Sequence, residues 1–315
     1  MNEAPAAGLD VILQSILCPV DFSNYSQQAL RWALALAARY RCRLIVLTAV
    51  DSLLFEAARA RLHVDLAQAE TEPALREFVE AVVPAGASWA PEIAFDVRVG
   101  NAADVILEAA DRHAADLVAM GTQGLGGFRK LLLGSTTECV LRKARTPVLT
   151  VPPHAPQSVV LNAGAARLEP GRVLVATDFS DTSLAAVRWA ADVARDMKVP
   201  LVLAHAVSRV TVPPQWQALT VESHEARVTD ARAKLEQLSV QFCGGQACET
   251  VVSVGRPADV IAAVADDREA GLIVMGLASE GGPRAPRPGS IAYGLLCIAR
   301  VPVVVVPPKS HSASA

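Results

Sequence analysis

The chain has few aromatic residues and no long block of one charge. Phe, Trp and Tyr together make up 4% of the 315 residues, and the formal net charge is −3 at pH 7. Lys and Arg never form a run of more than a few residues. A surface that binds nucleic acid needs clustered basic side chains for the phosphates and often aromatic side chains for the bases. The composition therefore argues against a nucleic-acid-binding protein.

Long hydrophobic segments are also missing, and we expect no leader at the N-terminus. The longest apolar runs are short and interrupted, whereas a membrane-spanning helix needs about 20 apolar residues. The N-terminal residues 1–5 lack the basic start and apolar core of a signal peptide. We therefore expect a soluble cytoplasmic protein that does not enter a membrane.

None of the six cysteines belongs to a CxxC pair. Cys18, Cys139 and Cys297 lie within apolar patterns, where a buried thiol is the ordinary interpretation. Cys243 and Cys248 flank a predicted glycine-containing loop. A redox or metal-binding pair is an alternative at that loop, although a zinc site would need two further ligands nearby.

The sequence does contain a tandem duplication. Asp21-Phe22-Ser23 recurs as Asp178-Phe179-Ser180, 157 positions later, and the pair Met120-Gly121 recurs as Met275-Gly276 after 155 positions. The change of offset indicates a two-residue deletion in the second copy. The period is far longer than that of a solenoid repeat, so we predict that each copy is a domain.

Composition and matching segments set the expected domain limits. We expect a first domain over residues 1–153, a linker over 154–171, a second domain over 172–308 and a tail over 309–315. Proline residues restrict the linker, and alanine and glycine residues loosen it. Ala, Val and Leu dominate a hydrophobic fraction of 52%, which suits helices packed on a buried sheet.

Apolar strands alternate with amphipathic helices in each copy. In the first copy we predict strands at residues 16–20, 44–50, 93–99, 117–120 and 148–151. We predict helices after a cap at Ser23 or Ser26, over 53–83 with a break near Pro73, over 102–112 and over 137–145. This order predicts a doubly wound α/β domain with a parallel sheet. Ligands of such sheets bind beyond the carboxyl ends of the strands, where the loops after the first and fourth strands open.

A glycine-rich loop follows the fourth strand. Gly121, Gly124 and Gly134 precede Ser135 and Thr136 at the start of a predicted helix. Glycine allows close approach of a phosphate or a positive φ, and a helix N-terminus attracts an anion. A dinucleotide fingerprint after the first strand and a loop ending in GK[ST] are both absent. The sequence therefore predicts a phosphate site of neither common kind.

These residues carry a family resemblance. The spacing G-x2-G-x9-G-[S/T], together with the segments 19–23 and 146–151, resembles the universal stress protein family in its tandem form. The resemblance covers nearly all of the chain outside the linker and the tail. It implies two Rossmann-like domains of the adenine nucleotide alpha hydrolase-like kind, each with a five-stranded parallel sheet and helices on both faces.

The resemblance also implies that the first domain binds ATP, with or without Mg²⁺. At the end of the first strand, Asp21, with Pro19 and Val20, would lie against the adenine and ribose. Ala49, at the end of the second strand, would meet the adenine through its backbone. Met120 and Gly121 would contact the ribose side, and Gly124, Gly134, Ser135 and Thr136 would hold the phosphates. The complete implied set is Pro19, Val20, Asp21, Ala49, Met120, Gly121, Gly124, Gly134, Ser135 and Thr136. Arg129 and Lys130 either reach phosphate oxygens or are solvated loop side chains.

The second copy departs from this pattern. Ser279 replaces Gly124, and residues 280–288 contain three prolines and Glu280. Proline removes N–H donors that a phosphate loop would use. We expect that the second domain binds nucleotide weakly or not at all. His205, inside an apolar strand, is predicted to be a core histidine with a hydrogen-bond partner rather than a ligand.

The first interpretation of function is a nucleotide-binding stress-response protein that acts as a sensor or regulator. The sequence contains no nucleophile elbow, no metal-ligand cluster and no clear general base beside the glycine loop. At most slow ATP hydrolysis is expected. A genuine ATPase or nucleotide transferase, with a metal near Ser135, is one alternative. A structural scaffold with a vestigial pocket is another.

The last strands of the two copies predict a partner surface. Residues 148–151 and 303–306 are apolar, and an apolar edge strand tends to pair with another strand. In the resembling family these strands pair across a dimer. We therefore expect an intramolecular pseudo-dimer of the two domains, and the sequence leaves open whether the whole chain also forms a homodimer.

Overall fold

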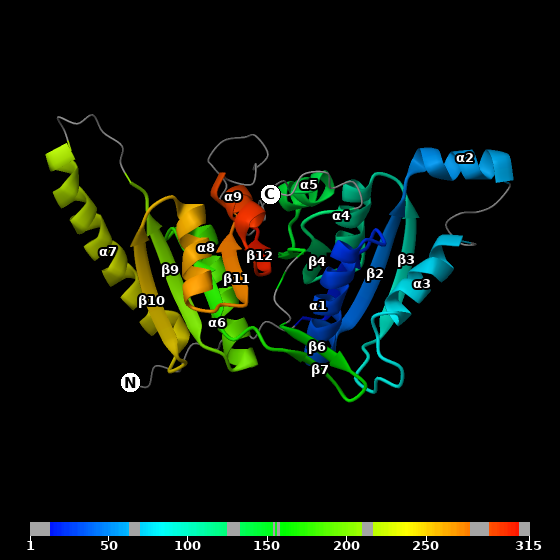
Figure 1. Ribbon diagram of the computed structural model, residues 1–315, viewed down its shortest axis with the longest axis horizontal. Helices are drawn as coiled ribbons and strands as arrows, with labels where there is room; N and C mark the ends of the chain where they lie inside the picture. The colour runs from blue at the N-terminus through cyan, green and yellow to red at the C-terminus, as the bar shows by residue number, and fades with distance from the viewer. Residues whose placement is uncertain are drawn as a thin grey trace, which may run out of the picture.

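The computed structural model describes residues 13–62, 70–124, 133–153, 155, 158–209, 217–277 and 290–308. Two halves of similar build are joined by a short hairpin (Figure 1). The elements of the first half are β1 (Ser15–Pro19), α1 (Asn24–Tyr40), β2 (Arg43–Val50), α2 (Ser52–Leu62), α3 (Glu72–Glu80), β3 (Ile93–Val99), α4 (Ala102–Arg112), β4 (Leu117–Gly121), α5 (Ser135–Lys143) and β5 (Val148–Val151).

The second half repeats this order. Its elements are β8 (Val173–Ala176), α6 (Asp181–Met197), β9 (Leu201–Val207), α7 (Gln217–Cys243), β10 (Cys248–Val254), α8 (Pro257–Asp267), β11 (Leu272–Gly276), α9 (Ser290–Ile298) and β12 (Val303–Val306). The single long helix α7 stands where the first half has α2 and α3. No described helix combines the length and the hydrophobicity that crossing a membrane requires.

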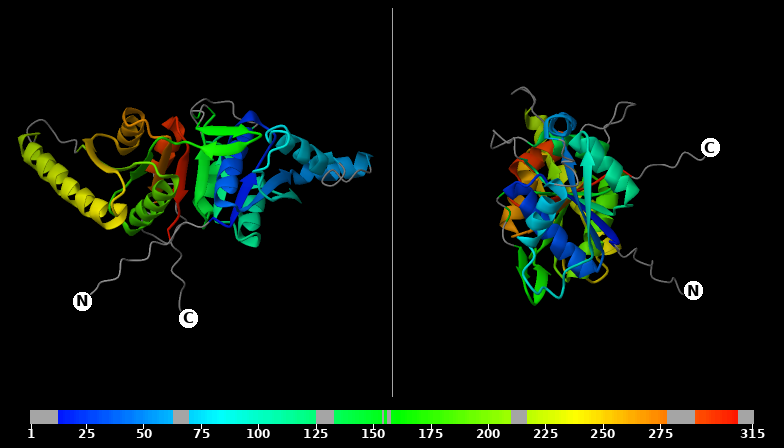
Figure 2. Two further views of the ribbon diagram at one scale, coloured as in Figure 1. Left: turned by 90° about the horizontal axis from the view of Figure 1, so that it is seen from below. Right: turned by 90° about the vertical axis from the view of Figure 1, so that its right-hand side faces the viewer.

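All the strands of the two halves belong to one sheet. Its order is β10-β9-β8-β11-β12-β5-β4-β1-β2-β3, with parallel pairing inside each half. Strands β5 and β12 meet in the middle and run antiparallel, as Figure 2 also shows for the red and green strands. The Thr150 hydroxyl donates a hydrogen bond of 3.0 Å to the carbonyl oxygen of Val303 across this junction. The predicted fold class, tandem α/β domains with parallel sheets, is confirmed.

Helices cover both faces of the sheet. One apolar core contains side chains of α1, α3, α6 and α7, and the other contains side chains of α4, α5, α8 and α9. Both faces of the central strands are therefore buried, which explains their near-continuous apolar sequences. Leu44, Ile45 and Leu47 of β2 are all fully buried.

The first helix of each half begins and ends in the same way. The Ser23 side chain accepts a hydrogen bond from the backbone N–H of Ser26, as Ser180 does from Ser183. Arg41 and Lys198 end these helices in the left-handed conformation. The predicted serine cap is thus at Ser23, and the duplicated cap sets both helices to the same length.

Two segments bear on the sequence predictions. Helix α3 carries Pro73 in its first turn, where proline is tolerated, and residues 70 and 71 directly before it have π-helical geometry. Residues 63–69 lie outside the described residues, so the predicted break of the helical stretch 53–83 near Pro73 stays a prediction. The expected linker contains an antiparallel hairpin, β6 (Val159–Asn162) and β7 (Ala165–Leu168). The Asn162 side-chain oxygen accepts from the backbone N–H groups of Gly164 and Ala165 at 3.0 and 2.9 Å and so closes the turn.

The hairpin is fixed to the first half and to the junction of the halves. Trp89 donates from its indole N–H to the carbonyl oxygen of Asn162 at 2.6 Å. Val159 is buried in the core, and Leu168 lines a small cavity between the two halves. These contacts give the hairpin the apolar support that a two-stranded ribbon lacks alone.

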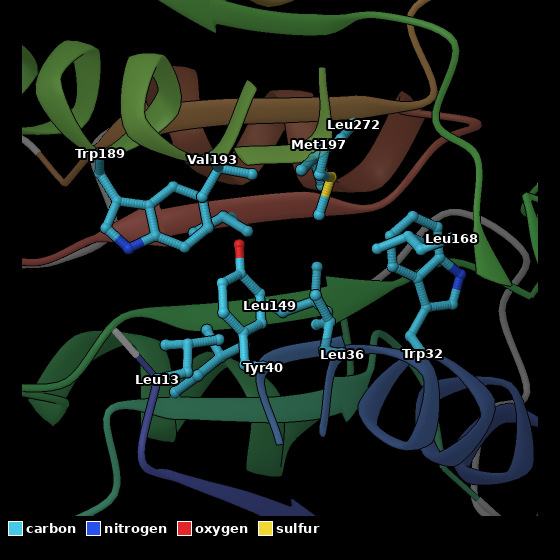
Figure 3. Close-up of a pocket in the computed structure, with 12 residues that line it drawn as sticks. Leu13, Trp32, Leu36, Tyr40, Leu149, Leu168, Trp189, Val193, Met197 and Leu272 are labelled. Atoms are coloured by element: carbon cyan, nitrogen blue, oxygen red, sulfur yellow. The ribbon is translucent and has the colours of Figure 1, made fainter. Parts of the chain in front are cut away.

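The cavity marks the seam between the halves. Residues of α1 and α6 face each other across it (Figure 3), and its volume of about 10 Å³ leaves room for little more than one water molecule. Trp32 and Trp189 occupy equivalent positions of the two copies, as do Leu36 and Val193. The seam is therefore an apolar contact between equivalent surfaces of the two copies.

One ion pair at the seam joins unlike charges at equivalent positions. Arg39 Nε lies 2.7 Å from Asp196 Oδ2, and these residues are 157 positions apart. Two first copies paired in this way would place arginine against arginine, and two second copies would place aspartate against aspartate. The charges therefore favour pairing of a first copy with a second copy.

Reversing one of these charges should destabilise the seam. We expect Arg39→Asp and Asp196→Arg each to lower the free energy of unfolding by about 0.2–1 kcal/mol, because both side chains are partly exposed. The double variant should recover most of the loss. Urea unfolding of the four proteins measures this coupling. If the double variant lost as much unfolding free energy as the two single variants together, the result would contradict an attractive pair across the seam.

Candidate functional site

The candidate site begins at the turn after β1. Asp21 Oδ1 accepts hydrogen bonds from the backbone N–H of Ser23 at 3.1 Å and from its hydroxyl at 2.6 Å. Phe22, between them, has a φ of 63°, a conformation that a bulky residue rarely adopts. The same strained turn recurs at Phe179, whose φ is 67°. The turn holds the Asp21 carboxylate at the carboxyl edge of the sheet.

The glycine loop meets this carboxylate. A Cβ atom on Gly124 would lie 2.6 Å from Asp21 Oδ2, so the residue after β4 and the residue after β1 are in close contact. Strands β1 and β4 are neighbours in the sheet, which explains why the two loops converge. A Cβ on Gly121 would lie 3.1 Å from the carbonyl oxygen of Tyr25.

The glycines serve close approach and not an unusual backbone conformation. The described glycines with positive φ do not include Gly121, Gly124 or Gly134. Of the two properties of glycine considered from the sequence, a positive φ is therefore not used at these positions. The lack of a side chain matters instead, because a Cβ on Gly124 would displace the Asp21 carboxylate and a Cβ on Gly121 would press on the Tyr25 backbone.

Helix α5 begins directly after the loop. Its N-cap is Gly134, which has no side chain to cap the first turn, and whose backbone N–H donates to the carbonyl oxygen of Thr122 at 2.8 Å. The Thr137 hydroxyl donates to the carbonyl oxygen of Gly121 at 2.9 Å. Ser135 is exposed and Thr136 is partly exposed. First-turn N–H groups and two hydroxyl groups thus stand at the positive end of the helix dipole.

The remaining predicted residues lie at the same edge of the sheet. Pro19 ends β1, and the backbone N–H of Val20 donates to the carbonyl oxygen of Leu47 in β2 at 2.8 Å. Ala49 is partly exposed near the end of β2. Met120 is only 5% exposed and packs in the core, so its side chain is not available to a ligand.

Two parts of the predicted site are outside the described residues. Arg129 and Lys130, the candidate phosphate-binding cations, fall in residues 125–132. The proline-rich stretch of the second copy falls in residues 278–289. Within the described ranges, His, Cys, Asp and Glu form no group of three or more that could hold a metal ion.

The second half retains the carboxylate turn. Asp178 Oδ1 accepts from the Ser180 backbone N–H at 3.0 Å and from its hydroxyl at 2.5 Å. Burial raises the pKa of Asp178, but the hydrogen bonds from Ser180 and Ser183 outweigh burial and hold the pKa below its ordinary value. The carboxylate geometry alone therefore does not distinguish the two halves.

A histidine distinguishes the second half. His205 stands where the first half has Thr48, and its Nδ1 lies 2.7 Å from the carbonyl oxygen of Thr177. The predicted hydrogen-bond partner is thus present. The imidazole also lies against the Phe179 ring, with 4.6 Å between ring centres. In the first half the corresponding Phe22 instead meets Phe78 edge-on at 5.6 Å. The spacing of the repeat in the sequence aligns His205 with Thr48. No sequence pattern indicates the contact between the His205 and Phe179 rings.

Comparison with known proteins supports this description. The model of the universal stress protein family matches residues 13–152 and again residues 170–307. The universal stress protein Rv2623 of Mycobacterium tuberculosis is 28% identical over 300 residues, which cover 92% of this chain and 95% of that protein. The universal stress protein MJ0531 of Methanocaldococcus jannaschii is 29% identical over 140 residues, 44% of this chain and 82% of that protein.

A solved structure shows the same fold over nearly the whole length. A universal stress protein from Archaeoglobus fulgidus matches with a TM-score of 0.63 and 22% identity, covering 94% of this chain and 97% of that one. The two matched regions of the family model coincide with the two halves that meet at β5 and β12. The chain belongs to the universal stress protein family and contains two tandem domains of that family.

Proposed function

We propose that the first domain binds an adenine nucleotide, with ATP as the principal ligand. The close approach of Gly124 to the Asp21 carboxylate carries this proposal, since a Cβ atom at Gly124 would stand 2.6 Å from Asp21 Oδ2. It places a hydrogen-bond acceptor for sugar hydroxyls beside a loop that has no side-chain bulk. The uncapped start of α5 follows within the same loop and offers N–H groups to the phosphates.

The other proposed contacts surround this centre. The backbones of Pro19, Val20 and Ala49 would border the adenine and ribose, and the Met120-Gly121 backbone would border the ribose from the other side. The start of α5 would hold the phosphates through Gly134, Ser135 and Thr136. Buried Met120 contributes only its backbone. Mg²⁺, where bound, would be held mainly by the phosphates, because the described residues contain no ready cluster of metal ligands.

We further propose that the second domain has lost this activity. Its Phe179 ring lies on His205 at the end of β9, beside the turn that holds Asp178. This tilted pair of rings fills space at this edge, where the first domain has the smaller Thr48 in place of His205. The sequence of residues 279–288, with serine in place of glycine and three prolines, agrees with this loss.

The proposed role is that of a sensor or regulator that responds to nucleotide binding. The site as described offers binding groups and no evident base or nucleophile placed against a phosphate. We also infer that the two domains act as an intramolecular pseudo-dimer, which the antiparallel pairing of β5 with β12 supports. The proposed units are residues 1–153 and 172–308, connected by 154–171.

The chain contains a matched control for the nucleotide site. Asp21 and Asp178 make the same hydrogen bonds within their turns, so substitution by alanine removes equivalent structural contacts. We expect Asp21→Ala to weaken ATP binding about 10- to 100-fold, as for loss of hydrogen bonds to a charged group. Asp178→Ala should leave the affinity unchanged within about twofold.

Calorimetric titration with ATP gives both the affinity and the number of sites. We expect one site per chain in the wild type and in Asp178→Ala. Two sites of comparable affinity would contradict the loss of function in the second domain. Wild-type binding of cAMP or GTP in preference to ATP would contradict the choice of ligand. No binding of any nucleotide would favour the scaffold with a vestigial pocket.

A methyl group at Gly124 tests the close contact itself. Gly124→Ala would place its Cβ against the mobile end of the Asp21 side chain, so the carboxylate should be displaced while the fold stays intact. We expect ATP binding to weaken by at least about tenfold, with little change in the urea midpoint. Gly164→Ala is the control, because its Cβ would have only an ordinary contact at 3.7 Å. Unchanged ATP affinity in Gly124→Ala would argue against this contact as the centre of the site.

A further inference from the structure

The second domain contains two cysteines at one helix–strand junction, away from the carboxyl edge of the sheet. Cys243 is the last residue of α7, and Cys248 is the first residue of β10. The two thiols lie close enough to shift each other's pKa. Both cysteines are in the free thiol form, and both pack against the core on the α6 and α7 face of the sheet.

The turn between them fixes this arrangement. The backbone N–H of Gln246 donates to the carbonyl oxygen of Cys243 at 2.8 Å, and its side-chain amide donates to the carbonyl oxygen of Val199 at 2.9 Å. Gly244 and Gly245 have φ values of 49° and 89°, which glycine adopts without strain. The turn therefore brings the end of α7 directly back to the start of β10, with only four residues between the two cysteines.

The surroundings make the two thiols unequal. The hydrogen bond from Cys248 lowers the pKa of Cys243, burial opposes this effect, and the positive charge of Arg195 adds to it. The guanidinium group of Arg195 is held in place by Asp192 at 2.8 Å and by the carbonyl oxygen of Phe242 at 3.0 Å. The same hydrogen bond, together with burial, raises the pKa of Cys248. Cys243 is thus the thiol that becomes the nucleophilic thiolate.

A small oxidant can reach the pair at Cys248. Cys243 is only 3% exposed, but Cys248 is partly exposed and begins β10, an edge strand of the sheet. Gly244 and Gly245, between the two cysteines, are exposed, so the junction of α7 and β10 lies at the surface of the protein.

We propose that Cys243 and Cys248 form a reversible dithiol–disulfide site that small hydroperoxides oxidise. The Cys243 thiolate attacks the outer peroxide oxygen, the O–O bond breaks, and an alcohol or water leaves with a proton while a sulfenic acid forms. The Cys248 sulfur then attacks the Cys243 sulfur, and the sulfenic oxygen leaves as water. The two thiols lose two electrons and two protons, and the peroxide is reduced.

This site is independent of the nucleotide proposal, because it depends only on the junction of α7 and β10. Zinc binding by the same pair is less well supported, since the described residues place no third His, Cys, Asp or Glu ligand in a group with them. The disulfide would tie the end of α7 to the first residue of the edge strand.

Peroxide treatment of the reduced full-length protein tests the site. The remaining thiols are blocked with N-ethylmaleimide before digestion with trypsin, and peptides are identified by mass spectrometry. Both cysteines fall on the peptide 235–268, because the bond before Pro257 resists trypsin. After peroxide treatment we expect this peptide to be two hydrogen atoms lighter and to carry no maleimide. When the oxidised protein is reduced with dithiothreitol before blocking, the peptide should carry two maleimides.

Partly exposed Cys139 in the first domain is the internal reference. The pair should oxidise at least about tenfold faster than Cys139. In Cys248→Ser, Cys243 should proceed to sulfenic or sulfinic acid without a disulfide, and in Arg195→Gln the reaction should slow. The proposal is overturned if peptide 235–268 keeps two free thiols while Cys139 is oxidised. It is also overturned if the only disulfides formed join separate chains.

Discussion

The pairing of β5 with β12 is the constraint on which the rest of the structure depends. Each strand is buried, and Thr150 is the single polar residue of the two; each strand would be an exposed edge if its domain stood alone. Their antiparallel pairing removes both edges and brings α1 and α6 together around an apolar seam. The seam is also specific for one copy of each kind, because Arg39 and Asp196 carry opposite charges at equivalent positions.

The two domains are held together at the buried centre of the sheet, so the residues at the carboxyl ends of the strands can differ between the two copies. Both domains keep the strained Asp-Phe-Ser turn, since it caps the first helix as well as placing a carboxylate. The contrast lies in the neighbours of that turn. Gly124 lies against Asp21 in the first domain, whereas His205 lies against Phe179 in the second. A duplicated fold can thus keep its structural contacts while only one copy keeps a site open for a ligand.

Much of this organisation could be predicted from the sequence, for physical reasons that particular segments illustrate. The run at Leu44–Val50 is apolar because both faces of a central parallel strand are buried, so its position was evident. A serine cap at Ser23 or Ser26 was recognisable, and the structure places it at Ser23. The hairpin at 159–168 was not, because its strands are short and partly exposed and depend on Trp89 and the seam for support. The positions of the site residues followed from the family resemblance, but the role of the glycines depended on distances that no sequence pattern contains.

Hydrogen–deuterium exchange with and without ATP tests the central claim most directly, because it reports both domains of the intact chain at once. The account predicts slower exchange on ATP addition at the turn after β1 and at the start of α5. It predicts no change at the equivalent turn after β8 or at the start of α9. Equal protection in both domains, or protection confined to the second, would contradict the assignment of the nucleotide site to the first domain.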